Sequence, residues 1–311
     1  MIEKPGDVTI SATPRYPKQR RKVLDREIAY VEVGQGDPIV FLHGNPTSSF
    51  LWRNVIPHLE SLGRCIAPDL IGMGDSDKLP NSGPGSDRFV DQRRYLDALL
   101  EALDVRKRVT LVIHDWGSGL GFDWANRHRD AVRGIAYMEA IVGPQGWDHW
   151  DNMKMRPLLQ ALRSDAGEEM VLQDSFFIEK ILPGAILRTL SPEEMAEYRR
   201  PFVEPGEGRR PTLTFPREIP IEGEPADVAE IVSAYGAWLA QSNVPKLFIR
   251  PNRRTPGRRS ESRHCALMAI SDRGHGQGCT FRSRRFAERD WAGGRKVDDH
   301  AELTNREAGP R

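Results

Sequence analysis

The chain has 311 residues, with 45 basic and 44 acidic side chains, a net charge of +1 and 39% hydrophobic residues. This composition excludes general disorder, and the balanced charge gives no reason to expect a nucleic acid or an anionic membrane as partner. The three cysteines form no disulfide framework, and no apolar run approaches the roughly 18 residues of a membrane span. Because the N-terminus also lacks a signal-peptide core, we expect a cytoplasmic protein, and a monomer.

Apolar runs and helical patterns alternate along the first half of the chain, after a polar segment over 1–22 that we expect to be flexible. Strands are predicted at 23–27, 28–33, 38–42, 64–69, 109–113 and 132–138. Helices are predicted at 50–62, capped by Ser48 or Ser49, and at 91–103 and 118–127. Strands that alternate with helices predict an α/β fold with a mostly parallel sheet and helices on both faces.

The pattern changes after residue 143. Residues 144–224 are rich in Trp, Phe, Met and Pro and show short helical pieces, which predicts a helical cap over the sheet. A helix at 226–239 and a strand at 246–249 resume the core, which therefore comprises 23–143 and 225–250. Within the cap, five apolar side chains are candidates for lining a substrate pocket, with ordinary packing as the alternative role of each: Phe176, Phe177, Leu182, Ile186 and Leu187.

The motif Ile113-His114-Asp115-Trp116-Gly117 ends a buried strand directly before a helix. Folds of the α/β-hydrolase type place their nucleophile on such a turn, and here Asp115 takes that position, although Ile113 replaces the usual Gly. A helix cap or an ion-pair partner is the alternative role of Asp115.

Two further motifs follow neighbouring strands. HGNP, at 43–46, places the backbone N–H of Asn45 where it would stabilise an oxyanion together with that of Trp116. PDLIGMGDSD, at 68–77, follows the next strand, and three such features in this order are hard to obtain by chance. His43 and His114 flank these motifs, and we expect both to be structural hydrogen-bonding residues.

On these motifs, residues 23–250 closely resemble the haloalkane dehalogenases of the α/β-hydrolase superfamily. The segments that carry the resemblance are FLHGNPTSSFLWRNVIPHLE, APDLIGMGDSDK, LVIHDWGSGLGFDWANRH, AYMEAIV, ILPGAILR, RRPTLTFPREIPI and PKLFI. The resemblance implies Asp115 as the nucleophile and Glu139 as the acid of a catalytic triad, with a surface salt bridge as the alternative role of Glu139. It also implies that the side chains of Asn45 and Trp116 hold the halide.

The implied reaction converts a small halogenated hydrocarbon and water into a primary alcohol, a halide and a proton, without a metal or an organic cofactor. Residue chemistry agrees with this reaction, because a carboxylate that attacks an sp³ carbon forms an ester, which water can cleave, whereas a serine would form an inert ether. An indole N–H and an amide NH₂ are weak, fixed donors that suit a soft halide.

The last 61 residues, 251–311, do not share the resemblance. They hold 14 basic and 8 acidic side chains, and 13 of the basic residues are Arg. The family ends with a strand, a Gly-Ala-His-Phe turn that carries the catalytic His, and a final helix. Here Thr280 stands at the position of that His.

Codons can be chosen that encode the sequence around Thr280. When the same nucleotides are read one position later, they encode the missing Gly-Ala-His-Phe turn. Our hypothesis is therefore a frameshift near residue 251, natural or from sequencing, with loss of the last strand and helix. His264, His275 and His300 remain as candidate bases, none of them in a matching context.

Three alternatives remain open. An epoxide hydrolase also uses Asp on this fold, but would favour an aromatic residue in place of Asn45 and tyrosines in the cap, near which only Tyr198 and Tyr235 lie. Luciferase-like relatives use oxygen and share the HDWG motif. The third alternative is an inactive product of a frame-shifted gene.

Overall fold

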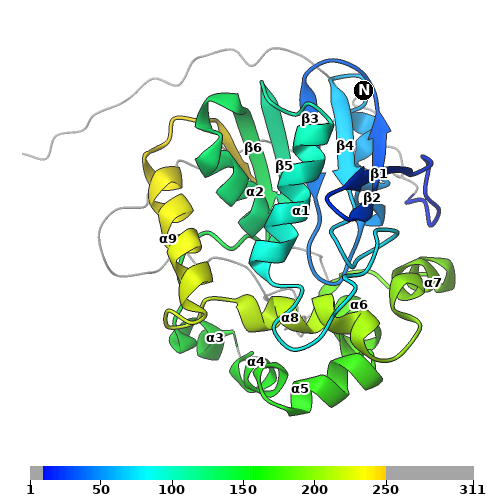
Figure 1. Ribbon diagram of the computed structural model, residues 1–311, viewed down its shortest axis with the longest axis vertical. Helices are drawn as coiled ribbons and strands as arrows, with labels where there is room; N and C mark the ends of the chain where they lie inside the picture. Colours follow the sequence, from blue (N-terminus) through cyan, green and yellow to red (C-terminus); the bar gives the residue numbers. More distant parts are fainter. Residues whose placement is uncertain (1–9, 154, 250–311) are drawn as a thin grey trace, which may run out of the picture.

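The computed structural model describes residues 10–153 and 155–249, which form a sheet of seven strands in the order β1-β2-β4-β3-β5-β6-β7 (Figure 1). The pairs β1–β2 and β2–β4 are antiparallel, and all the other neighbouring strands are parallel. The strands are β1 (Gln19–Val23), β2 (Arg26–Val33), β3 (Pro38–Leu42), β4 (Arg64–Pro68), β5 (Val109–His114), β6 (Val132–Met138) and β7 (Lys246–Phe248). The predicted mostly parallel sheet is confirmed.

Apolar clusters cover both faces of the sheet. In β3, Val40 and Leu42 belong to the larger cluster, whereas Ile39 and Phe41 belong to a second one. This alternation follows from the two-residue period of a strand. The larger cluster is built with α1 (Phe89–Ala102), α2 (Trp116–Arg127) and α9 (Ala226–Gln241), which lie together in front of the sheet in Figure 1.

The second face is covered by two short 3₁₀ turns, η1 (Ser49–Trp52) and η2 (Ile56–His58), where we predicted one helix over 50–62. Ser48 caps η1 as expected, since its side chain accepts a hydrogen bond from the N–H of Phe50. Pro57 has no backbone N–H and cannot donate the hydrogen bond that would continue an α-helix. The apolar residues, although spaced as in a helix, therefore lie on two 3₁₀ turns.

The segment between β6 and α9 is helical and gathers at one end of the sheet (Figure 1). It carries η4 (Glu169–Gln173) and η5 (Phe177–Ile181), which are π-helical turns, and two 3₁₀ turns, η6 (Arg200–Phe202) and η7 (Glu207–Arg209). Its α-helices are α3 (Trp147–Asn152), α4 (Arg156–Arg163), α5 (Ala166–Glu168), α6 (Leu182–Ala185), α7 (Pro192–Arg199) and α8 (Arg210–Glu218). We refer to this segment as the cap.

Residues 10–22 differ from the flexible N-terminus that we predicted over 1–22. Residues 19–23 form the strand β1, which pairs with β2, whereas we expected most of this segment to be flexible. Upstream of β1, Tyr16 donates a hydrogen bond to Glu60, and Ser11 accepts one from Arg53 at 2.7 Å. The polar composition led to the wrong prediction, because these residues bind the core mainly through hydrogen bonds, with Tyr16 also packing against the second apolar cluster.

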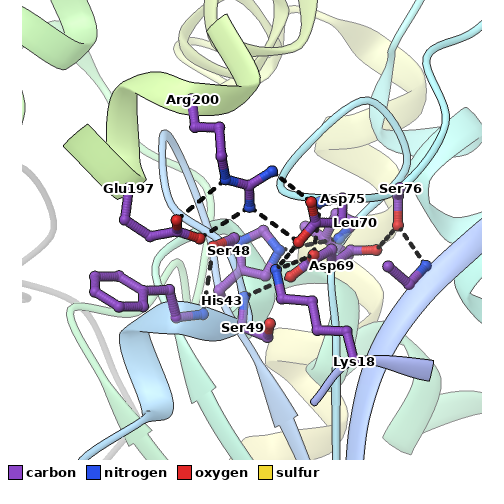
Figure 2. A network of polar contacts seen from close by, with 12 residues as sticks. Lys18, His43, Ser48, Ser49, Asp69, Leu70, Asp75, Ser76, Glu197 and Arg200 are labelled. Carbon is purple, nitrogen blue, oxygen red and sulfur yellow. Dashed lines mark hydrogen bonds and ion pairs between the residues drawn. The ribbon is translucent and has the colours of Figure 1, made fainter. Parts of the chain in front are cut away.

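A buried polar network holds the N-terminal segment to the loop after β4 (Figure 2). The Nζ atom of Lys18 lies 2.7 Å from Asp69 and 2.5 Å from Asp75. Asp69 is fully buried and also accepts backbone N–H bonds from Ser49 at 2.7 Å and from Asp75 at 2.8 Å. Every oxygen of the Asp69 carboxylate is thus bound by a donor.

The same network reaches the cap. Arg200, at the start of η6, pairs with Asp75 in the core and with Glu197 in α7 (Figure 2). A second buried ion pair joins Arg53 of the core to Glu194 of α7, whose carboxylate also binds Arg188. These contacts fix α7 and η6 over the carboxyl end of the sheet, where a site would lie in an α/β fold.

Residues 251–311 lie outside the described residues, and with them Thr280, the three candidate bases His264, His275 and His300, and the predicted loss of the last strand and helix. Within the described ranges, no helix combines the length and the apolar character needed to cross a membrane.

Candidate active site

Asp115 occupies the turn between β5 and α2. Its backbone has φ +53° and ψ −130°, a left-handed region that non-glycine residues rarely adopt. Glycines allow the close approach: a Cβ on Gly117 would collide with the backbone oxygens of Leu42 and His43, and a Cβ on Gly44 would collide with the Asp115 carboxylate. The tight strand-to-helix turn that the sequence predicts is therefore present, and it pushes the Asp115 side chain outward.

The Asp115 carboxylate lies in an apolar environment with few donors. It is 8% exposed, and its Oδ1 accepts the backbone N–H of Asn45 at 2.6 Å. Burial raises the pKa of Asp115 to about 6, although the charge of His114 and the backbone N–H groups of Trp116 and Asn45 act in the opposite direction. Above pH 6 the site therefore holds a weakly solvated carboxylate anion, which is the form needed for nucleophilic attack.

Glu139 follows β6 directly, and its backbone is also left-handed, with φ +47°. Strands β5 and β6 run in register with His114 opposite Met138, so Glu139 comes next to His114. The Nε2 atom of His114 lies 2.9 Å from Oε2 of Glu139. Burial disfavours the charged imidazole, but the hydrogen bond and the negative charge of Glu139 outweigh burial and raise the pKa of His114.

His43 and His114, which we expected to have similar structural roles, differ in their surroundings. His43 is fully buried, its Nε2 accepts the backbone N–H of Leu70 at 3.0 Å, and burial lowers its pKa to about 4. His114 instead lines the cavity that contains Asp115 and Glu139. The expectation fits His43, whereas the position of His114 connects it to the site.

Asn45 and Trp116 also line this cavity. The Asn45 amide donates one N–H to the carbonyl of Thr212 at 3.1 Å, which fixes the orientation of the amide. The Trp116 ring is 1% exposed and stacks on Phe215 with ring centroids 5.4 Å apart. Both side chains are therefore held by their neighbours, as preorganised donors must be.

The cavity has a volume of about 150 Å³ and lies between the sheet and the cap. Of the five predicted lining residues, Phe177, Leu182 and Ile186 are present, but Phe176 is not, and Leu187 is 66% exposed on the outer surface. The sequence missed several other lining residues from separate parts of the chain: Pro46, Thr47, Leu51, Ile181, Ala185, Tyr198, Pro216 and Ile219. All of these except Tyr198 stand inside the segments that carry the family resemblance, and that resemblance was the available signal.

Only one of the two tyrosines considered at the cap lines the cavity. Tyr198 does, packed edge-on against Phe50 with ring centroids 5.2 Å apart. Tyr235 is buried behind the site and donates its hydroxyl to the carbonyl of Ile141 at 2.7 Å.

A parallel sheet, an acid on a strained strand-to-helix turn and a helical cap over that acid define an α/β hydrolase. In agreement, the family model described as "alpha/beta hydrolase fold" matches residues 37–180. Among curated proteins, a haloalkane dehalogenase from Sphingobium indicum is 57% identical over 253 residues, which cover 81% of this chain and 85% of the relative. This chain belongs to the haloalkane dehalogenase family.

Two further proteins are similar to this chain, one of them a dehalogenase and the other a monooxygenase by name. The crystal structure of a haloalkane dehalogenase from Bradyrhizobium elkani matches with a TM-score of 0.70 and 46% identity, over 75% of this chain and 79% of that one. A coelenterazine h 2-monooxygenase from Renilla reniformis is 45% identical over 236 residues, which cover 74% of this chain and 74% of that protein. The resemblance noted in the sequence is thus confirmed, and the chain is also similar to a protein named as a monooxygenase.

Proposed function

We propose that this protein hydrolyses carbon–halogen bonds of small haloalkanes, with Asp115 as the nucleophile. The observation that carries the proposal is the placement of a buried, weakly solvated carboxylate in the same apolar cavity as Asn45 and Trp116. An apolar cavity favours an uncharged organic halide as ligand, and it leaves the attacking carboxylate with little solvent to displace.

In the first step, a carboxylate oxygen of Asp115 forms a bond to the carbon that bears the halogen, and the halide departs with the electron pair of the broken bond. The Asn45 amide and the Trp116 indole would receive the halide as its charge develops. Of the Asn45 amide, one N–H remains for this purpose, because the other binds Thr212.

In the second step, water attacks the carbonyl carbon of the ester. The backbone N–H groups of Asn45 and Trp116 already bind the Asp115 carboxylate and would stabilise the oxyanion. A general base takes the proton from water, and the alcohol leaves as the carboxylate of Asp115 is restored. We propose Glu139 as the acid that orients this base.

The epoxide hydrolase alternative is not favoured. The position at which an epoxide hydrolase would favour an aromatic residue is Asn45, which lines the cavity, and among the described residues a single cap tyrosine, Tyr198, lines it. The oxygen-dependent alternative has less support than hydrolysis, since the Renilla relative is 45% identical and the Sphingobium relative 57%.

The experiment is mass spectrometry of the purified 311-residue chain after mixing with 1-bromobutane. The first step needs only described residues, so we expect a mass increase of one butyl group, mapped by peptide fragmentation to Asp115. The ester should accumulate, because loss of a general base costs about 10²–10⁴-fold in rate. Alkylation at any other residue, with no butyl group on Asp115, would contradict the proposal.

The frameshift hypothesis has its own test with the same substrate. A gene in which the reading frame is restored near codon 251 should encode a chain that turns over and carries little ester at steady state. The 311-residue chain should release at most one bromide per molecule. Sustained bromide release by the 311-residue chain would refute the inactivation hypothesis and would identify the tail, first of all His275, as the place to seek a base.

A further inference from the structure

His114 lines the same cavity as the carboxylates of Asp115 and Glu139. It is the residue that precedes Asp115 in the chain, and its ring reaches across the end of β6 to Glu139, with 2.9 Å between Nε2 and Oε2. The three side chains line one cavity, and the side chains of His114 and Glu139 are 19% and 30% exposed. Without the imidazole, two carboxylates would face each other in an apolar enclosure.

The contacts of His114 are unsuited to proton transfer from water. Its Nε2 is engaged by Glu139, and its Nδ1 is buried without a hydrogen-bond partner among residues 10–153 and 155–249. A general base must come within hydrogen-bond reach of the water that it activates. Nε2 is occupied by Glu139 and Nδ1 is enclosed by the protein, so we infer that His114 contributes through its charge and its position.

Few other charges act on this group. From the end of β3, His43 lies close enough to interact with His114, but burial keeps His43 neutral above about pH 4. From the cap, η5 and α6 present apolar side chains to the cavity, and α7 presents Tyr198. Among the described residues that line the cavity, His114 is the one side chain able to carry a positive charge.

We propose that His114 is a positioning residue that, held by Glu139, keeps a positive charge between the two carboxylates and thereby keeps Asp115 ionised at neutral pH. This inference rests on the proposed function of Asp115 and adds to it the residue that sets the working pH range. In this arrangement Glu139 binds His114 through Oε2, which leaves Oε1 for a second partner.

The sign of the effect follows from electrostatics. An opposite charge within about 4–6 Å favours the ionised form of a carboxylate by 1–3 pKa units, and a like charge disfavours it. Loss of the imidazolium alone leaves Glu139 as an uncompensated like charge, so the midpoint of Asp115 ionisation should move to higher pH. Loss of His114 and Glu139 together removes one charge of each sign and should return the midpoint close to its original value.

The test compares the parent chain with His114→Gln, with His114→Gln/Glu139→Gln and with a control, His58→Gln, which lies away from the cavity in η2. The ionisation of Asp115 is followed by its side-chain carboxyl ¹³C shift between pH 4 and 9, with the signal assigned by its loss in Asp115→Asn. Single-turnover bromide release from 1-bromobutane is measured over the same range.

For His114→Gln we expect the midpoint of Asp115 to rise by about one pH unit or more, and bromide release at pH 6 to fall about fivefold or more with an unchanged limiting rate at pH 9. The double variant and His58→Gln should both stay within about half a unit of the parent. A rate that falls equally at all pH values, with the carboxyl midpoint unchanged, would overturn the inference, because a purely structural role predicts that pattern.

The two readouts separate the inference from the proposed function. If the carboxyl midpoint moves as expected while no chain releases bromide, the role of His114 stands and the dehalogenase proposal fails. If bromide is released but the midpoint in His114→Gln equals that of the parent, the inference fails and the dehalogenase proposal is unaffected.

Discussion

Two buried aspartates, Asp69 and Asp115, follow strands of the same sheet that are separated by β3, and the two side chains differ in their surroundings. Asp69 comes directly after β4 and is bound by the ammonium of Lys18 and by two backbone N–H groups (Figure 2). Asp115 comes directly after β5, and among the described residues no Lys or Arg lies within ion-pair distance of its carboxylate. Both are almost inaccessible to solvent, with exposures of 0% and 8%.

The difference lies in how many donors each carboxylate keeps. A buried carboxylate that is paired with a cation and hydrogen-bonded through both oxygens is stable in its charged form and is a poor nucleophile. A buried carboxylate with few donors has a raised pKa and a reactive oxygen. Burial alone therefore does not distinguish a structural aspartate from a reactive one, whereas the set of donors does.

The largest expected effect is on the rate of bromide release, which should depend on Asp115 and not on Asp69. Asp115→Asn should lower first-turnover bromide release at pH 8 by at least about 10⁴-fold, because a neutral amide is a poor nucleophile. Rapid mixing with 1-bromobutane and detection of bromide measure this rate. Asp69→Asn is the matched control and should retain the parent rate per folded molecule. Equal losses in both variants would argue that neither carboxylate is the nucleophile.

The proposed halide donors beside Asp115 should have the next largest effect. Asn45→Ala and Trp116→Phe should each slow bromide release about 10²–10³-fold, since each removes one preorganised donor. The phenyl ring in Trp116→Phe can keep the stacking on Phe215 while the indole N–H is lost. Halide quenching of tryptophan fluorescence gives the affinity, and an unchanged bromide affinity in Asn45→Ala would speak against a halide-binding role.

In stability the two aspartates should respond with opposite signs. Asp69→Asn should lower the free energy of unfolding by about 3 kcal/mol, because it leaves Lys18 and the buried donors partly uncompensated. Asp115→Asn should raise it by about 1–3 kcal/mol at pH 8. Urea denaturation of both variants measures the difference, with Asp77→Asn, near the surface, as a control that changes stability by less than about 0.5 kcal/mol.

The sign for Asp115 follows from its pKa of about 6. The folded protein holds this proton more tightly than the unfolded chain, in which an aspartate has a pKa of about 3.9. Stability is therefore lost as the pH rises between these two values and stays at the lower level above pH 6. The gain in Asp115→Asn should accordingly vanish when unfolding is measured below about pH 4. A gain that persists there would need another cause.

The smallest expected effect concerns the outer part of the Asp69 network. Arg200→Met removes the ion pair between the cap and Asp75 and should cost at most about 1 kcal/mol, since Arg200 is 45% exposed. Burial would raise the pKa of Asp75, but Arg200 and Lys18 outweigh burial and hold it at about 2. This stabilisation is present above about pH 4 and is lost as the pH falls toward 2, so parent and variant should converge there in acid unfolding.

Much of the fold was predictable because its signals are local. The apolar runs at 38–42 and 132–138 coincide with β3 and β6, and the Asp115 turn lies where the HDWG motif indicates. The failures occurred where tertiary contacts decide. Residues 10–22 are ordered by hydrogen bonds to distant groups, and the region 50–62 forms 3₁₀ turns because Pro57 interrupts its helical spacing.

The candidate site shows the same division. Asp115, Glu139, Asn45 and Trp116 are named by short motifs, and all four line one cavity. The partnership of His114 and Glu139 was missed, because it depends on the register of β5 and β6, which no local pattern encodes. Likewise, Leu51 of η1 and the pair Pro216 and Ile219 at the end of α8 come to the cavity from two distant places in the chain, each with an ordinary apolar side chain.

Asp115 and Glu139 both adopt positive φ angles, +53° and +47°, at the ends of adjacent strands. A side chain with a Cβ destabilises such a conformation by about 1–2 kcal/mol, whereas glycine adopts it freely. Sequence drift without selection for activity would therefore favour Gly at these two positions, because that replacement relieves the strain. In a lineage whose gene has lost its reading frame, codons 115 and 139 should therefore be among the first to change, and the residues found there would indicate how long selection for activity has been absent.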